Sequence, residues 1–147
     1  MVSGLVPRSS REQMMRLYLL AAMLLGTTAL NAAAPVTGVW RNPQRSVEID
    51  MASCGQRLCG TVVWASDKAQ DDAAAGGTDR LIGMQLFQGL VRDGPNHWQG
   101  DVFVPDLAQT VSGSMTLVDA QTLQVDGCAI PGLLCQTQIW TRAPRRR

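Results

Sequence analysis

The chain of 147 residues has the length of one ordinary domain, and its hydrophobic fraction of 46% is typical of a packed globular protein. The formal net charge is only +1, whereas a nucleic-acid partner calls for clustered cations. Length and composition therefore favour a single domain that does not bind nucleic acid.

The first 34 residues are predicted to be an N-terminal extension followed by a signal peptide. Arg11 and Arg16 precede an apolar run, 17–25, and small residues follow it. This run is shorter than the roughly 20 apolar residues that span a membrane, so no stable membrane span is expected after processing, with an uncleaved anchor as the alternative. Cleavage is expected after Ala32, although residues 32–34 also match the small-residue pattern. Residues 1–13 contain LVPRSS, which resembles a thrombin-cleavable linker, and Met14 or Met15 is the expected start.

The rest of the chain divides into a predicted domain, residues 35–143, and a basic C-terminal tail, residues 144–147. From Pro35 onward ten Lys and Arg stand against eleven Asp and Glu, so the net charge is −1. Three of these cations are Arg145, Arg146 and Arg147, which leaves the domain itself mildly acidic. A terminal run of charges is usually solvated and disordered, which is our expectation here, with contact to anionic lipid or polysaccharide as the alternative.

The apolar residues of the domain recur with a period of two, which predicts β-strands, and no long helical stripe is present. In residues 110–118, Val111, Met115 and Leu117 alternate with serine and threonine, as in a strand with one dry face. Turn residues such as Asn42-Pro43 and Asp93-Gly94 separate the runs. The predicted strands are Gly38–Asn42, Ser46–Ala52, Leu58–Ala65, Gln85–Arg92, His97–Val104, Thr110–Val118, Thr122–Cys128 and Cys135–Arg142.

Eight strands in one open sheet would leave two edges exposed. The predicted fold class is therefore all-β, as a small antiparallel up-and-down barrel or a tight sandwich. One segment, Asp67–Asp79, does not alternate and is polar and acidic, so it is predicted to be a mobile loop. It lacks the ordered ligand positions and the terminal Glu of an EF-hand calcium loop, so no metal site is predicted there.

The four cysteines, Cys54, Cys59, Cys128 and Cys135, are the strongest local signal. An even number in an exported chain of this size indicates disulfides. The spacings Cys-x4-Cys and Cys-x6-Cys fit neither a zinc knuckle nor a Cys-x-x-Cys redox pair. Short turns favour Cys54–Cys59, facing each other across a four-residue loop, and Cys128–Cys135. The crossed pairings stay open at this point.

No catalytic residue and no cofactor are predicted. His97 is the only histidine, and it lies between Asn96 and Trp98 at a strand start without an evident partner. The segment Val111–Met115 lacks the glycines of a nucleophile elbow, and no glycine-rich loop opens a helix. Asp50 and Asp101 come nearest to an acid inside an apolar run, and ordinary outward strand positions explain them better. The chain is therefore not expected to be an enzyme.

The order of several short motifs resembles the bacterial family known as domain of unknown function 2147 (DUF2147). These motifs cover nearly all of residues 36–143, and they are Thr-Gly-Val-Trp40, Leu-Cys-Gly-Thr-Val-Val-Trp64, Leu81-Ile-Gly83, Gln88-Gly-Leu90, Trp98-Gln-Gly100, Leu123-Gln-Val-Asp-Gly-Cys128 and Trp140-Thr-Arg142. The resemblance implies an exported Gram-negative protein, periplasmic or secreted, with a small lipocalin-like barrel of eight strands. No agreed activity comes with it.

Two sets of site residues follow from this barrel. Trp40 and Arg142 resemble the calycin arrangement, in which an arginine on the last strand covers a tryptophan on the first; a purely core role for Trp40 is the alternative. The leading hypothesis is non-catalytic binding of a small apolar or amphiphilic ligand. An envelope module that interacts with another protein is the alternative. The candidate lining residues are Trp64, Leu86, Phe87, Phe103 and Met115.

Overall fold

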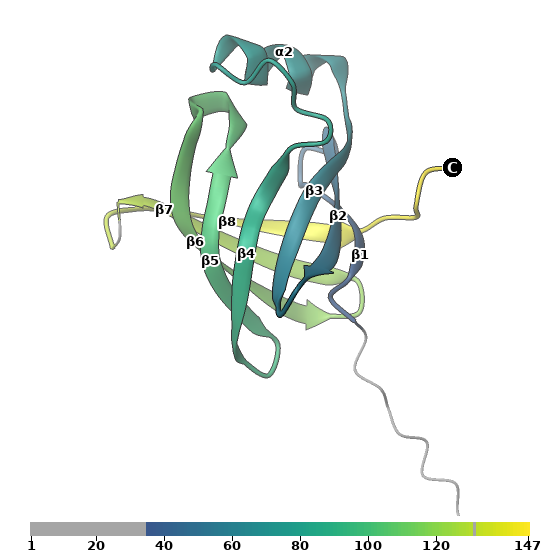
Figure 1. Ribbon diagram of the computed structural model, residues 1–147, viewed down its shortest axis with the longest axis vertical. Helices are drawn as coiled ribbons and strands as arrows, with labels where there is room; N and C mark the ends of the chain where they lie inside the picture. Colours follow the sequence, from purple (N-terminus) through teal and green to yellow (C-terminus); the bar gives the residue numbers. More distant parts are fainter. Residues whose placement is uncertain (1–34, 131) are drawn as a thin grey trace, which may run out of the picture. The chain divides into compact units, whose positions relative to one another are not determined.

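A computed structural model describes residues 35–130 and 132–147, and the predicted extension and signal peptide lie outside the described residues. Eight antiparallel strands follow one another in chain order around a closed barrel (Figure 1). The sandwich alternative is thereby excluded, because β1 and β8 pair and leave the sheet no open edges. The elements are β1 (Gly38–Arg41), β2 (Val47–Cys54), β3 (Arg57–Ala65), α2 (Asp67–Ala75), β4 (Gln85–Gly94), β5 (His97–Val104), the 3-10 helix η1 (Pro105–Leu107), β6 (Gln109–Asp119), β7 (Thr122–Ile130) and β8 (Leu134–Arg142).

Part of the barrel interior is filled by the chain's own side chains. Trp40, Ile49, Met51, Phe87 and Met115 are among the residues with almost no exposed surface. Gly60 makes room for this packing, because a Cβ there would lie 2.5 Å from the Met51 sulfur and 2.6 Å from a ring carbon of Phe87. The strand pattern of alternating burial therefore produces a solid core in this part of the barrel.

The acidic segment predicted to be a loop is instead a helix, α2, which Figure 1 shows beyond the ends of the strands. The Ser66 hydroxyl accepts a hydrogen bond from the amide of Ala69 and so caps the first turn. Lys68 and Asp72 form an i,i+4 ion pair on the exposed side, and Ala73 is fully buried. The prediction missed these local signals because only one residue of the helix is buried, so no apolar stripe marks it. Within the described residues, no helix has the length and apolar character that crossing a membrane requires.

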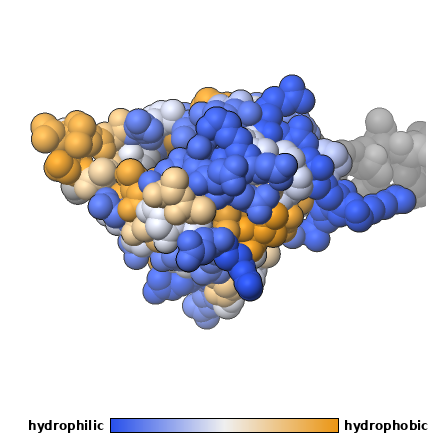
Figure 2. All heavy atoms as spheres, turned by 90° about the horizontal axis from the view of Figure 1, so that it is seen from above, coloured by the Kyte–Doolittle hydropathy of each residue, from blue (hydrophilic) through white to orange (hydrophobic). Residues whose placement is uncertain are grey.

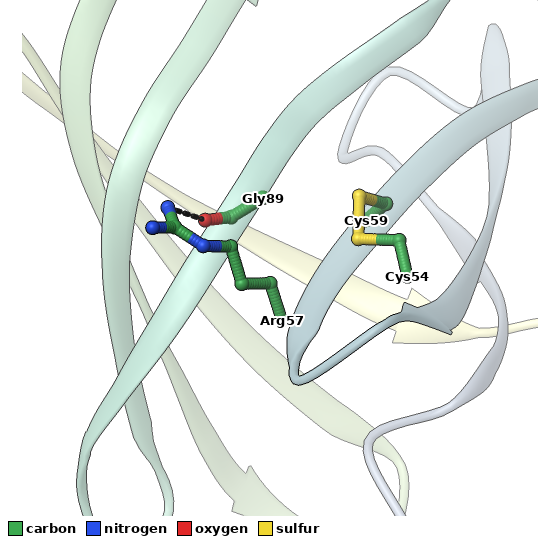
Figure 3. The surroundings of a disulfide bond; sticks show 4 residues. All are labelled: Cys54, Arg57, Cys59 and Gly89. Atoms are coloured by element: carbon green, nitrogen blue, oxygen red, sulfur yellow. Dashed lines mark hydrogen bonds between the residues drawn. A yellow bond between two sulfur atoms is a disulfide. The ribbon is translucent and has the colours of Figure 1, made fainter.

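Both predicted disulfides are present, and they are the local pairs. Cys128 and Cys135 lie directly opposite each other in the β7–β8 ladder. The geometry of the first pair differs from the prediction: Cys54 pairs with Arg57, and Cys59 with Ala52, so Cys54–Cys59 is a diagonal link. The turn has two residues rather than four, and Gly55 with φ +68° gives it the left-handed conformation that tight hairpins need. Arg57 reaches across to β4 and donates to the Gly89 carbonyl (Figure 3).

The seam between β1 and β8 is short, with Trp40 opposite Arg142 and Arg41 opposite Thr141. The Arg142 guanidinium lies over the Trp40 ring, 4.2 Å from its centroid. It also donates to three carbonyls, those of Pro35, Thr37 and Ala120, at 2.7 to 3.0 Å. One side chain of the last strand thus ties together the start of β1 and the turn between β6 and β7.

The C-terminal tail, whose four residues are exposed, contacts the outer face of the barrel through two of its arginines. Arg145 forms an ion pair with Asp50 at 3.2 Å, and Arg146 donates to Glu48. Glu48 alternates with the core residues Ile49 and Met51 on β2, so its side chain lies on the outer face of the barrel. It is nevertheless fully buried, because Arg41 and Arg146 cover its carboxylate. A carboxylate removed from water needs such partners. The hydrogen bonds from Arg146, and next to them those from Arg41, lower the pKa of Glu48 despite its burial.

Replacing Arg142 by Ala is expected to lower the free energy of unfolding by about 2 kcal/mol, because three hydrogen bonds and one cation–π contact are lost together. Arg57→Ala is the matched control, since that arginine is exposed and makes one long hydrogen bond to Gly89. Urea denaturation of the two variants measures the difference. Equal losses would contradict a special role for Arg142 at the seam.

The stability should depend on pH through Glu48. Its folded pKa lies below the ordinary value of 4.5, so the unfolded chain binds the proton first and stability falls as the pH drops below 4.5. The stability difference between wild type and Glu48→Gln should therefore be full at pH 7 and shrink as the pH falls through the folded pKa. Thermal melts from pH 7 to pH 3 test this, with Asp50→Asn as a control on the same strand. A difference that does not vary with pH would refute the assignment.

Candidate functional site

A cavity of about 880 Å³ opens at the end of the barrel where α2 and η1 lie. Its lining comes from the turn between β1 and β2, from α2 and η1, and from the strands β4 to β8. This volume is in the range of small-molecule sites. The barrel is therefore solid in one part and hollow in another.

The floor and walls of the cavity are mainly apolar, although β8 also contributes Gln136 and Gln138. Phe87 and Trp140 both line it and pack edge to face, with ring centroids 6.0 Å apart. This aromatic pair separates the hollow part from the core that contains Met115, which is fully buried and is not among the lining residues. The other apolar wall residues include Leu81, Leu86, Val102, Phe103, Val111 and Val125.

Charged groups enter the cavity lining only at the rim, from Lys68 and Asp72 of α2 and from Asp106 of η1. Lys68 and Asp72 are 2.6 Å apart, and this hydrogen bond raises the pKa of Lys68, so the ammonium stays charged. The helix and η1 are fastened together, since Thr78 donates to the Pro105 carbonyl and a Cβ on Gly76 would collide with the Asp106 backbone. The rim thus has a fixed polar side.

Another part of the rim is apolar and projects from the barrel. Leu133 and Leu134, at the tip of the β7–β8 hairpin, line the cavity and yet are 75% and 59% exposed. Figure 2 shows this tip as a hydrophobic patch at the edge of the molecule on the left. Ile130 adds to the patch, and the segment from Gly127 to Thr141 contains no charged residue. The mouth therefore has one polar and one apolar side.

The structure brings three of the five predicted lining residues together, Leu86, Phe87 and Phe103. Met115 lies in the core below them. Trp64 does not line this cavity: it pairs with Glu48 on the outer face of the barrel and lies under the Arg146 guanidinium, 4.1 Å away. The pairing of β2 with β3 shifts by one residue between Glu48 and Ile49. Such a β-bulge changes which residues of a strand point inward, so simple alternation along the sequence misplaces Trp64.

Several lining residues escaped the prediction. Trp140 could have been predicted from the sequence. It is a large aromatic residue on the predicted strand Cys135–Arg142, and it lies two residues before Arg142. Leu133 and Leu134 lie between the last two predicted strands, and the residues of α2 lie in the segment predicted to be a loop, so the strand pattern selects neither group. Much of the cavity lining comes from the connections between strands, and the strand pattern makes no prediction there.

The cavity does not contain the only histidine of the chain. His97 pairs with Asp93 in the hairpin between β4 and β5, at the far end of β4 from α2. Among the described residues, His, Cys, Asp and Glu do not gather in a group of three that could hold a metal ion. What the cavity offers is apolar surface and a polar rim, which is suited to binding.

A closed eight-stranded antiparallel barrel with an open cavity at one end is a lipocalin-like protein. In agreement, the fold matches the solved structure of protein HP1028 from Helicobacter pylori, described as belonging to the lipocalin family, with a TM-score of 0.60 and 10% identity over 76% of this chain and 85% of that one. The chain belongs to the family DUF2147, described as uncharacterized protein conserved in bacteria, whose model matches residues 38–142. No curated protein matches the sequence. The predicted fold and family are thus confirmed, and a lipocalin-like fold is usually non-catalytic.

Removing the cap of α2 should loosen this side of the rim. Ser66→Ala eliminates the hydrogen bond to the Ala69 amide, at an expected cost of about 1 kcal/mol to the helix. Amide hydrogen exchange should then speed up in residues 67–75 and stay unchanged in β6 and β7. Ser53→Ala, an exposed serine near the end of β2, is the control. Unchanged exchange in α2 would show that packing against η1 alone fixes the helix.

Proposed function

We propose that the barrel binds a small amphiphilic ligand, with its apolar part against Phe87 and Trp140 and its polar part at the rim formed by α2. The single observation that carries this is the division of the 880 Å³ cavity into an apolar interior and a charged rim. The similarity of the fold to a lipocalin-family structure supports this proposal, because eight-stranded barrels of this kind can hold one small ligand. The uncharged wall disfavours an ion as the buried part, because a buried charge would find no opposite charge there.

The place of action that we propose is the periplasm or the exterior of a Gram-negative cell. The two disulfides support a location outside the cytoplasm, since oxidised cysteine pairs persist in such compartments. Membership of a bacterial family fits the same proposal. Periplasmic binding of an amphiphile is thus the function that we put forward.

A fluorescent amphiphile provides the first test. N-phenyl-1-naphthylamine gains fluorescence in an apolar site, so it should titrate to saturation with the protein and be displaced by fatty acids or lysolipids of matching size. Native mass spectrometry of the protein from periplasmic extract should then identify a bound natural amphiphile. A probe signal that rises without saturation, and that no amphiphile displaces, would speak against a ligand cavity.

Gly127 offers a way to fill the cavity without disturbing the fold. It lines the cavity, and a Cβ there would meet only Val111 at an ordinary 3.8 Å. Gly127→Leu is therefore expected to fold normally and to weaken probe binding by about tenfold, or 1.4 kcal/mol. Thr141→Leu, exposed on the outer face of β8, is the matched control and should bind like wild type. Equal affinity of both variants would place the probe elsewhere.

The alternative, an envelope module that interacts with another protein, is favoured by one observation, the exposed apolar tip with Ile130, Leu133 and Leu134. Exposed apolar patches of this kind often mark contact sites. The double variant Leu133→Gln and Leu134→Gln separates the two functions. Retained probe binding together with loss of a cross-linked envelope protein in cells supports the alternative. Reduced probe binding assigns the tip to the ligand site.

A further inference from the structure

A second cluster of interacting side chains lies on the outside of the barrel, away from the cavity. Its centre is Glu48, a carboxylate without exposed surface. Arg41, directly opposite on β1, donates from Nε and Nη2 to one carboxylate oxygen, Oε1, at 2.8 and 2.5 Å. The other oxygen, Oε2, accepts no hydrogen bond from Arg41 and is left for a second partner.

That partner is Arg146 of the tail. Its Nε donates to Oε2 of Glu48 at 2.7 Å, and its Nη2 reaches Oε1 at 3.2 Å. The same guanidinium lies over the Trp64 ring, 4.1 Å from the centroid. A planar fork on a carboxylate combined with stacking on an aromatic face suits a guanidinium better than an ammonium. An ammonium is attracted to the ring face, but it has no plane to stack and no rigid pair of parallel N–H bonds.

We propose that Glu48 and Trp64 form a guanidinium-binding site on the outer wall of the barrel, and that the chain's own C-terminal tail is its resident ligand. The tail leaves the strand ladder after Ala143, whose amide donates to the Val39 carbonyl, because the next residue, Pro144, has no N–H to continue the pairing. Beyond that point side chains hold it. The contact of Arg145 with Asp50 is long and 71% exposed on the arginine, so Arg146 is the principal anchor.

The position of the site gives the tail a structural role. Glu48 and Arg41 face each other across the β1–β2 ladder, and β1 is joined to β8 by a short seam. The tail therefore crosses from the end of β8 over β1 to β2 and fastens the seam from outside. A guanidinium from another chain would have to displace it, and the local concentration of a tethered group makes the tail the stronger competitor.

Variants of the tail provide the first test. Arg146→Ala should lower Tm by several degrees, and Arg146→Lys should not restore it, since lysine keeps the charge and loses the fork and the stacking. Arg145→Ala, the neighbouring arginine, is the matched control and should melt close to wild type. A full recovery in Arg146→Lys would reduce the site to a simple charge contact and overturn the proposal.

Chemical rescue tests the binding site itself. In Arg146→Ala the site is empty, so ethylguanidinium should shift the indole NMR signal of Trp64, assigned with Trp64→Phe, in a saturable way and raise Tm. Wild type, with its tail in place, should need a roughly tenfold higher concentration. Butylammonium at equal ionic strength should produce neither effect. Identical responses of wild type and Arg146→Ala, or equal effects of the two cations, would overturn the proposal.

Discussion

The closure of the barrel depends on the contact between Trp40 and Arg142. The first strand has four residues and pairs with the last at two positions, so the ladder alone holds the seam weakly. The guanidinium compensates by stacking on the ring and by binding three carbonyls, two just before β1 and one in the turn between β6 and β7. Gly38 allows this, because a Cβ there would lie 2.9 Å from the guanidinium. Without closure, β1 and β8 would be two exposed edges of an open sheet.

Once the seam is closed, the size of the side chains decides where the barrel is hollow. Around the seam, Trp40, Ile49 and Met51 occupy the interior, and Gly60 lets Phe87 approach them. Beyond Phe87 and Trp140 the inward positions of β7 carry Val125, Gly127 and Ala129, which are too small to reach across. The cavity is thus a consequence of small residues on one strand facing an aromatic pair. The same short chain can therefore build both a core and a binding space.

The sequence predicts the features that repeat or that depend on neighbours along the chain. Strand alternation identified eight strands, and the short spacing of the cysteines favoured the observed pairs. The contact of Trp40 with Arg142 was reached through the family resemblance. The helix α2 escaped because a single buried alanine leaves no periodic stripe. The contacts of the tail could not be predicted, because its partners, Glu48 and Trp64, are far away in sequence. The alternation of apolar and polar residues does not show whether a carboxylate on the outer face is exposed or covered by another segment.

Charge is distributed in opposite ways on the two faces of the barrel wall. The outer face at β2 buries a carboxylate between two guanidiniums, where several hydrogen bonds compensate its loss of water. The inner wall carries no charged residue except at the rim, so a ligand gains there chiefly by transfer of apolar surface, about 25 cal/mol for each Å² buried. Burying about 200 Å² of a ligand's apolar surface would contribute roughly 5 kcal/mol, from which the entropy lost on binding must be subtracted. Such a wall distinguishes ligands by size and shape, while Lys68, Asp72 and Asp106 at the rim are the groups that can select a polar head.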